Sequence, residues 1–144
     1  MRRYIFAVLA YLVPTFALGF VWHLVLFQSY YDALGVSRRD IIIPFGFVSM
    51  LIQAAIFAWV YGKTFAAFRG TLLSGALRYG LVGAALSWSF TTLAVAAKNV
   101  MASVPDYLLI ETAFTIVQWA LVAPLTVVSA SRPSQYESRV AMGS

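Results

Sequence analysis

Four long apolar stretches, separated by short polar loops, constrain this chain more than any other feature of its sequence. They cover residues 4–27, 41–62, 74–97 and 107–129, and a helix needs about 20 apolar residues to cross the hydrocarbon core of a bilayer. A soluble domain of 144 residues, 62% of them hydrophobic and 10% charged, has too little interior to bury that much apolar surface. We therefore expect an all-α polytopic membrane protein, in which residues 1–129 form one domain, an up-down bundle of four transmembrane helices.

Basic residues are unevenly divided between the two sides of this expected bundle. The side that holds both termini and the central loop has seven, which are Arg2, Arg3, Lys63, Arg69, Arg78, Arg132 and Arg139. The other side has three, which are Arg38, Arg39 and Lys98. Because Lys and Arg favour cytoplasmic loops, both termini are predicted to be cytoplasmic. Residues 130–144 show no apolar periodicity and are expected to be a disordered cytoplasmic tail.

Serine and aspartate precede two of the expected spans with the spacing of a helix cap. Ser37 and Asp40 lie before the second span, and Ser103 and Asp106 lie before the fourth. A serine oxygen accepts from an early helical N–H, and an acidic residue three positions later is favoured by the helix dipole. These residues are therefore predicted to cap helices.

The chain lacks the residues that most catalytic and cofactor chemistries need. There is no cysteine and only one histidine, His23, which excludes disulfides and thiolate sites and disfavours a histidine metal centre. Phosphate-binding loops, nucleophile elbows and HExxH motifs are also missing from the sequence. The net charge of +5 comes without a basic run interleaved with aromatics. We therefore expect no enzyme, no cofactor, no metal and no nucleic-acid partner.

Two ionisable residues inside the spans, His23 and Glu111, are expected at similar depths in the outer half of the membrane. Ionisable side chains within a bilayer are costly, so each calls for a role. If they meet, they would form a proton-responsive or cation-binding pair, because a carboxylate favours the charged imidazole. The interpretation we favour is structural: each faces interfacial water, or the two make one hydrogen bond that orders the bundle.

Further polar residues recur at helical spacing and predict a polar seam inside the bundle. Its members are Gln53, Ser87, Thr91, Thr115 and Gln118. Small and hydroxylated residues allow close helix packing, so the seam is read first as packing and alternatively as a substrate path. Lys63, Arg69 and Arg78 are expected to contact anionic lipid headgroups on the cytoplasmic side.

The segment Gly19-Phe-Val-Trp22-His23-Leu-Val-Leu-Phe27, followed by Tyr31, Leu34-Gly35-Val36-Ser37 and Asp40, resembles the N-terminal signature of a family of small bacterial membrane proteins. It is the family catalogued as domain of unknown function 1761. The resemblance covers about the first 40 residues, and beyond them it extends only to the number and spacing of the spans. His23 stands where the family pattern has tyrosine. The resemblance implies four helices in a bacterial inner membrane and implies no known activity.

Three functions are compatible with these features. The first is an accessory or assembly subunit that packs with itself or with a larger membrane complex. The second is a small homo-oligomeric transporter or proton-coupled exporter that uses Glu111 and the polar seam. The third is a membrane enzyme or quinone-site protein that uses His23 and Glu111. Each of the three expects membrane lipids and either further copies of this chain or a larger complex as partners.

Overall fold

The computed structural model describes residues 1–37, 40–66 and 71–130, and helices account for most of them. Within these ranges the chain forms α1 (Arg2–Val21), η1 (Trp22–Leu26), α2 (Gln28–Leu34), α3 (Ile43–Val60), η2 (Tyr61–Phe65), α4 (Leu72–Ser87), η3 (Trp88–Leu93), α5 (Ala94–Lys98) and α6 (Val104–Ala130). The three η elements are π-helical turns that continue the preceding α-helix. No strand occurs among the described residues, which confirms the all-helical prediction.

Four continuous helical segments are long and apolar enough to cross a membrane: Arg2–Leu26, Ile43–Phe65, Leu72–Lys98 and Val104–Ala130. The expected four helices of spanning length are therefore confirmed, with ends that differ by a few residues. The predicted disordered tail lies outside the described residues, apart from Ala130, which ends α6.

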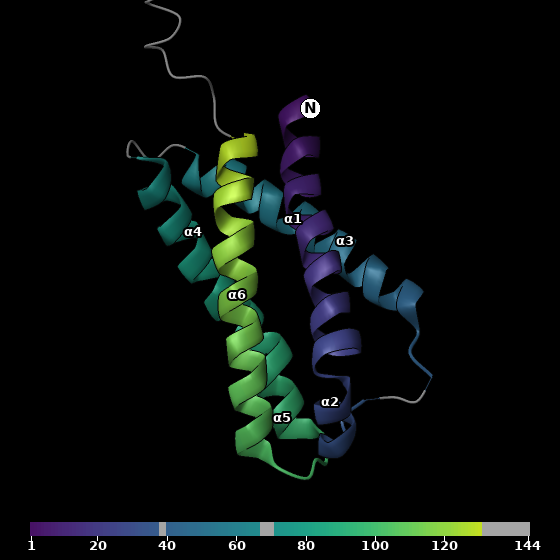
Figure 1. Cartoon of the computed structure of the whole chain (residues 1–144). Coiled ribbons are helices and arrows are strands. Elements are labelled where there is room, and N and C mark those ends of the chain that lie inside the picture. The colour runs from purple at the N-terminus through teal and green to yellow at the C-terminus, as the bar shows by residue number, and fades with distance from the viewer. Residues whose placement is uncertain (38–39, 67–70, 131–144) are drawn as a thin grey trace, which may run out of the picture.

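The bundle is organised around α6, which packs against α1 on one side and α4 on the other, while α3 packs against α1 (Figure 1). Met1 and Ala130 lie at the same end of the molecule, and α2 and α5 lie at the opposite end (Figure 1). In the fourth span 39% of the most apolar window is buried, against 11% in both the second and the third. The first and fourth spans therefore form the centre, and α3 is largely peripheral.

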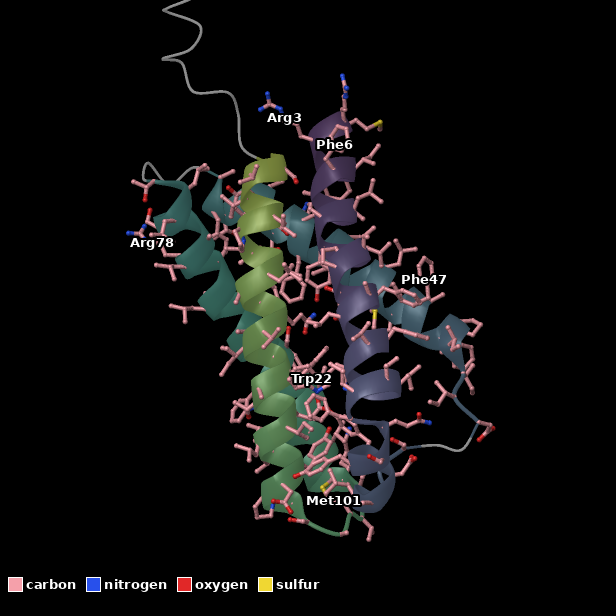
Figure 2. All side chains as sticks on the ribbon, viewed as in Figure 1. Arg3, Phe6, Trp22, Phe47, Arg78 and Met101 are labelled. Carbon is pink, nitrogen blue, oxygen red and sulfur yellow. The ribbon has the colours of Figure 1, made fainter. Side chains whose placement is uncertain are left out.

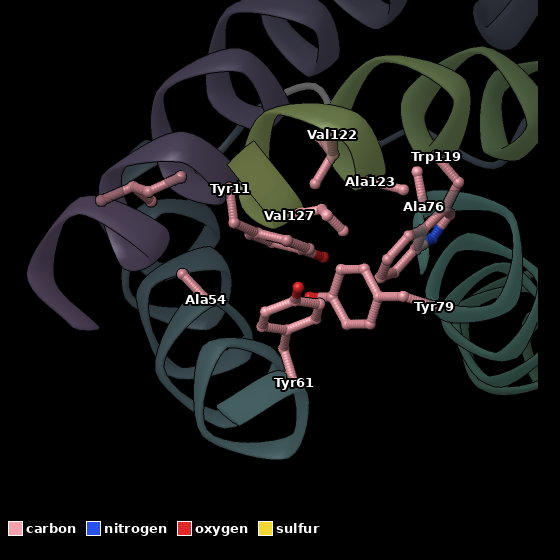
Figure 3. Packing of buried hydrophobic residues seen from close by; sticks show 10 residues of the cluster. Tyr11, Ala54, Tyr61, Ala76, Tyr79, Trp119, Val122, Ala123 and Val127 are labelled. Carbon is pink, nitrogen blue, oxygen red and sulfur yellow. The ribbon is translucent and has the colours of Figure 1, made fainter. Parts of the chain in front are cut away.

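Aromatic side chains fill the core near the end that holds the N-terminus. Tyr11, Tyr61, Tyr79 and Trp119 point toward one another from four different segments (Figure 3). The ring centroids of Tyr11 and Tyr79 lie 5.8 and 5.5 Å from that of Trp119, in edge-to-face arrangements. The indole N–H of Trp119 donates to Ser87 Oγ at 3.0 Å. Rings and one hydrogen bond thus join all four spans at this level.

Of the two predicted caps, one is confirmed and the other is wrong. Ser103 Oγ accepts from the backbone N–H of Asp106 at 3.4 Å, at the start of α6. Ser37 does not cap α3, because that helix begins at Ile43 and has no side-chain cap. Pro44 occupies its first turn, where its fixed φ starts the helix without an N–H to be satisfied.

The first span does not run directly into a loop. Phe27 leaves helical geometry with φ −119°, and a second short helix, α2, follows and ends at Gly35 with φ +74°. The backbone N–H of Ala102 donates to the carbonyl of Leu34 at 2.9 Å, which ties α2 to the loop before α6. As a result α2 is held over the end of the bundle rather than projecting from it.

Candidate functional site

Three side chains from three helical elements meet at one carboxylate oxygen. Glu111, on α6, is buried with 7% of its surface exposed. Its Oε1 accepts from the hydroxyl of Tyr31, on α2, at 2.6 Å, and lies 3.2 Å from Nε2 of His23, on η1. The structure therefore brings together the two ionisable residues singled out from the sequence and adds a tyrosine to them. We call these three residues the carboxylate cluster.

The π-helical turn and two aromatic rings hold the imidazole in place. The Nδ1 atom of His23 lies 3.0 Å from the carbonyl oxygen of Gly19, one turn earlier. The imidazole also packs between Tyr31 and Phe114, with ring centroids 4.8 and 4.7 Å away. The ring of Trp22, next to His23, contacts Phe114 on α6, with centroids 5.8 Å apart (Figure 2). Because a π turn adds one residue to the helix, it changes which residues face α6 from this point on.

These contacts determine where the hydrogens of the cluster lie. A carbonyl oxygen only accepts, so Nδ1 of His23 carries a hydrogen that it donates to Gly19. Glu111 Oε1 accepts from Tyr31, and an ionised carboxylate, which only accepts, can take hydrogens from both of its neighbours. An ionised Glu111 in turn requires a hydrogen on Nε2 of His23, at 3.2 Å. We therefore assign an imidazolium–carboxylate pair whose charges cancel.

The hydroxyl of Tyr31 acts as a donor across the physiological pH range. Burial, and after it the hydrogen bond to Glu111 and the negative charge of that residue, raise the pKa of Tyr31 well above its ordinary value. The phenol therefore keeps its proton and contributes a neutral donor to the cluster.

A cavity of about 360 Å³ opens beside the cluster. Its wall comes from α1, η1, α3 and α6, with Ser87 and Thr91 from the third span. Among the described residues that line it, His23 and Glu111 are the ionisable ones. A second cavity, of about 280 Å³, lies between α3 and α4 and shares Gln53, Ser87 and Thr91 with the first. The cluster therefore borders a sizeable and partly open cavity, because Phe20, Ile41 and Ile43 in its wall are exposed.

The residues of the predicted seam have different surroundings. Gln118 is buried and donates toward Tyr11 and Thr15, at 3.5 and 3.4 Å, and the hydroxyl of Tyr11 donates to Gln53 Oε1 at 3.2 Å. This chain of polar groups links α6 through α1 to α3 and borders the first cavity.

The hydroxylated members of the seam mostly bond within their own helices. Thr115 donates to the carbonyl of Glu111 at 2.9 Å, and Thr91 donates to that of Ser87 at 2.8 Å. Ser87 also accepts across the bundle from Trp119. The seam is thus partly packing and partly cavity wall.

The basic residues expected at lipid headgroups lie apart from the cluster. Lys63 is exposed on η2 and Arg78 is exposed on α4, while Arg69 lies outside the described residues. Arg3 and Arg78 lie toward the end of the bundle that holds Met1, and Met101 lies toward the opposite end (Figure 2).

Tyr31 is the site residue that the sequence reading overlooked. In the sequence it stands out only as part of the family resemblance, but it is buried, with 3% of its surface exposed. A signal was present: Tyr31 and Leu34 share one face of a short segment that ends at Gly35, a common helix C-terminus. Read in that way, the segment is a capped amphipathic helix with its buried face toward the bundle.

No protein-family model, no curated protein and no solved structure matches this chain. The family resemblance of the first 40 residues therefore stays a prediction. The described residues also include no group of three or more His, Asp or Glu side chains placed to hold a metal ion. Function has to be argued from the carboxylate cluster and the cavity.

Proposed function

We propose that this chain is a small, non-enzymatic membrane transport protein. It binds a small amphiphilic molecule in the central cavity and exchanges a proton at His23–Glu111 as it does so. The observation that carries this proposal is that the cavity borders a hydrogen-bonded pair of ionisable residues, of which Glu111 is buried and His23 is half-buried. Ionisable groups at membrane depth that face a cavity are typical of proton relays and substrate sites. The rest of the lining is apolar or neutral, as expected for a site that binds a small molecule.

An assembly role is the second candidate function, because little of the surface of α3 is buried against the other helices. Only Ala54 and Ala58 are buried on α3, which leaves most of its surface for lipid or for another protein. A transporter of this size also needs further copies of the chain to enclose a path for its substrate. The two candidate functions therefore differ in the partner they require: a larger protein for assembly, and further copies of this chain for transport. The native mass of the gently extracted protein separates them: a complex with a larger protein supports the assembly role, and a homo-oligomer supports transport.

A transport assay tests the proposal. Proteoliposomes enclosing a pH-sensitive dye are given an imposed pH gradient and then tetraphenylphosphonium, triphenylphosphine oxide or tetraphenylborate, which are a cation, a neutral molecule and an anion. We expect one of these to collapse the gradient faster than in protein-free liposomes, and Glu111→Gln to lose this effect. If none of the three does so with the folded wild-type protein, transport is contradicted.

We also infer that both termini are cytoplasmic, in a bacterial inner membrane. The excess of basic residues at the end with the termini and the central loop supports this orientation. The chain has no cysteine, so Ala66→Cys and Ala102→Cys each give a protein with a single thiol. Both alanines are exposed, and they lie in loops at opposite ends of the bundle. In intact cells a membrane-impermeant maleimide should label Ala102→Cys, whereas labelling of Ala66→Cys should require permeabilised cells. The reverse pattern would overturn the orientation.

A further inference from the structure

We infer that the molecule bound in the cavity is a lipophilic monovalent cation, and that each bound cation releases one proton from His23. The inference rests on the proposed transport function and specifies its substrate class and stoichiometry. It depends on three properties of the site: which hydrogen-bonding positions are already used, what the cavity wall is made of, and how charge is balanced.

The positive member of the pair has no donor left for a ligand. One N–H of the His23 imidazolium is directed at Gly19 and the other at Glu111. An anion entering the cavity would have to break one of these bonds before it gained a donor. It would also meet the negative carboxylate at close range.

The negative member, by contrast, has acceptor capacity to spare. Both hydrogen bonds to the Glu111 carboxylate end on Oε1, and Oε2 accepts neither of them. A carboxylate has about four acceptor positions over its two oxygens. Because Glu111 is among the residues that line the cavity, its unused side is suited to a positive group.

Aromatic rings make up part of the wall around that carboxylate. Phe16, Phe20 and Phe114 line the same cavity. The face of a phenyl ring carries partial negative charge and attracts cations, most strongly where water is excluded. A cation with apolar substituents would contact these rings while its charge lies near Glu111. A small hydrated ion would gain little from an apolar wall.

Charge balance explains why a proton leaves. The cluster is neutral when His23 is an imidazolium and Glu111 a carboxylate. A bound cation alone would leave a net positive charge inside the bundle, which is costly at low dielectric. Loss of the Nε2 proton to water restores neutrality: the imidazole keeps its Nδ1 hydrogen on Gly19, and the carboxylate exchanges the imidazolium for the cation.

Other ionisable groups near the pair do not provide this proton. Tyr31 faces the pair from α2, and burial together with Glu111 keeps its pKa far above neutrality. Tyr107 lies one turn before Glu111 on α6 and is a phenol within the span. The described residues that α1, α3, α4 and η3 contribute to the cavity wall are uncharged. His23 is therefore the group that titrates with ligand binding.

The test measures binding and proton release together in purified protein. Tetraphenylphosphonium binding is followed by equilibrium dialysis against empty micelles, and proton release by an indicator dye in weak buffer. We expect one proton per bound cation. Affinity should fall by about tenfold per unit decrease in pH while His23 holds its second hydrogen, as linkage to one proton requires.

Two variants and one control complete the experiment. Glu111→Gln should weaken cation binding by roughly 100-fold, since the opposing charge is lost. His23→Asn should still bind the cation; by the same charge balance, Glu111 then becomes the group that holds and releases a proton, so the pH range over which the affinity changes should differ from that of the wild type. Asp106→Asn makes the same change from carboxylate to amide on the exposed first turn of the same helix, and should behave as wild type.

The outcomes separate this inference from the transport proposal. Binding of triphenylphosphine oxide in place of the cation would overturn the cation assignment and leave transport of a neutral molecule standing. Cation binding with no proton released would overturn the exchange. If the folded protein binds none of the cationic, neutral and anionic probes, the inference fails together with the transport function.

Discussion

Replacing Glu111 with glutamine is expected to change His23 from a doubly protonated imidazolium into a neutral ring that is protonated at Nδ1 alone. In the wild type the ionised carboxylate stabilises the hydrogen on Nε2, at 3.2 Å. A glutamine whose oxygen takes the place of Oε1 still accepts from Tyr31, but it is neutral and no longer favours a positive charge on the imidazole. The carbonyl of Gly19 keeps the Nδ1 hydrogen in place in both proteins. Without the opposing negative charge the imidazole is therefore expected to keep the Nδ1 hydrogen alone.

Nitrogen-15 NMR on histidine-labelled protein measures this change directly. His23 is the single histidine of the chain, so the spectrum contains one imidazole and needs no assignment. At neutral pH the wild type should show hydrogens on both nitrogens, and Glu111→Gln should show a bare Nε2. The Asp106→Asn variant should reproduce the wild-type spectrum. A wild-type ring with a bare Nε2 would place the proton on Glu111 and contradict the ion-pair assignment.

Stability should follow hydrogen bonding rather than charge at this position. Glu111→Gln keeps an acceptor for the Tyr31 hydroxyl and alters only the contact with His23, so we expect a loss of about 1 kcal/mol, the usual scale of a hydrogen bond between membrane helices. Glu111→Leu leaves the Tyr31 hydroxyl and the His23 Nε2 without their partner, and unsatisfied buried groups cost about 1–3 kcal/mol each. Thermal unfolding in detergent should therefore rank the wild type and Glu111→Gln close together and Glu111→Leu clearly below them.

The sequence allowed the four spans and the depth of the ionisable pair to be predicted, because both depend on counting residues against the thickness of a bilayer. His23 and Glu111 lie at corresponding distances from the outer ends of their spans, and depth alone suggested that they might face each other. Whether two residues at the same depth face each other also depends on how each helix is rotated about its own axis, and depth does not determine that rotation. The π turn at Trp22–Leu26 shifts the face of the helix by an amount that hydropathy does not register.

Ser37 shows where a sequence rule gave the wrong result, and Tyr31 shows a buried position that no sequence rule predicted. Aromatics near the end of a span commonly lie at the interface, but Tyr31 belongs to a separate helix that folds back over the bundle. That position depends on a tertiary contact, the hydrogen bond from Ala102 to Leu34. Ser37 has the spacing of a helix cap, but Pro44 starts α3 several residues later. In both cases a distant or stronger local constraint overrode a short motif.

Replacing Gly83 with alanine is expected to destabilise the bundle by about 1–3 kcal/mol or more, the usual range for overpacking a filled core. A methyl group at this position would overlap the indole ring of Trp119. The indole has little freedom to withdraw, because Phe57 and Tyr79 contact it with centroids 4.9 and 5.5 Å away, and Ser87 holds its N–H. Either α4 moves away from α6 or the indole leaves the core, and each loses packing that joins all four spans.

Gly75→Ala is the matched control, since it makes the same change on the same helix. Its added methyl group would lie 3.7 Å from Val127 Cγ1, an ordinary contact. Alanine also has a higher helix propensity than glycine, so this variant should be neutral or slightly more stable. Thermal unfolding in detergent compares the two variants, and equal melting temperatures would show that the close approach of α4 and α6 at Gly83 is not required.

A second substitution shows whether Trp119 is the reason for the loss. Trp119→Leu removes the ring that the Gly83 methyl group would strike, at the expense of a cavity in the aromatic core. In that background Gly83→Ala should cost less than it does alone, because the added methyl group occupies space that the indole has left. Residues in direct contact give such non-additive double-mutant cycles, with coupling of about 0.5–3 kcal/mol. Additive effects would instead mean that Gly83→Ala acts through the backbone of α4, independently of the indole.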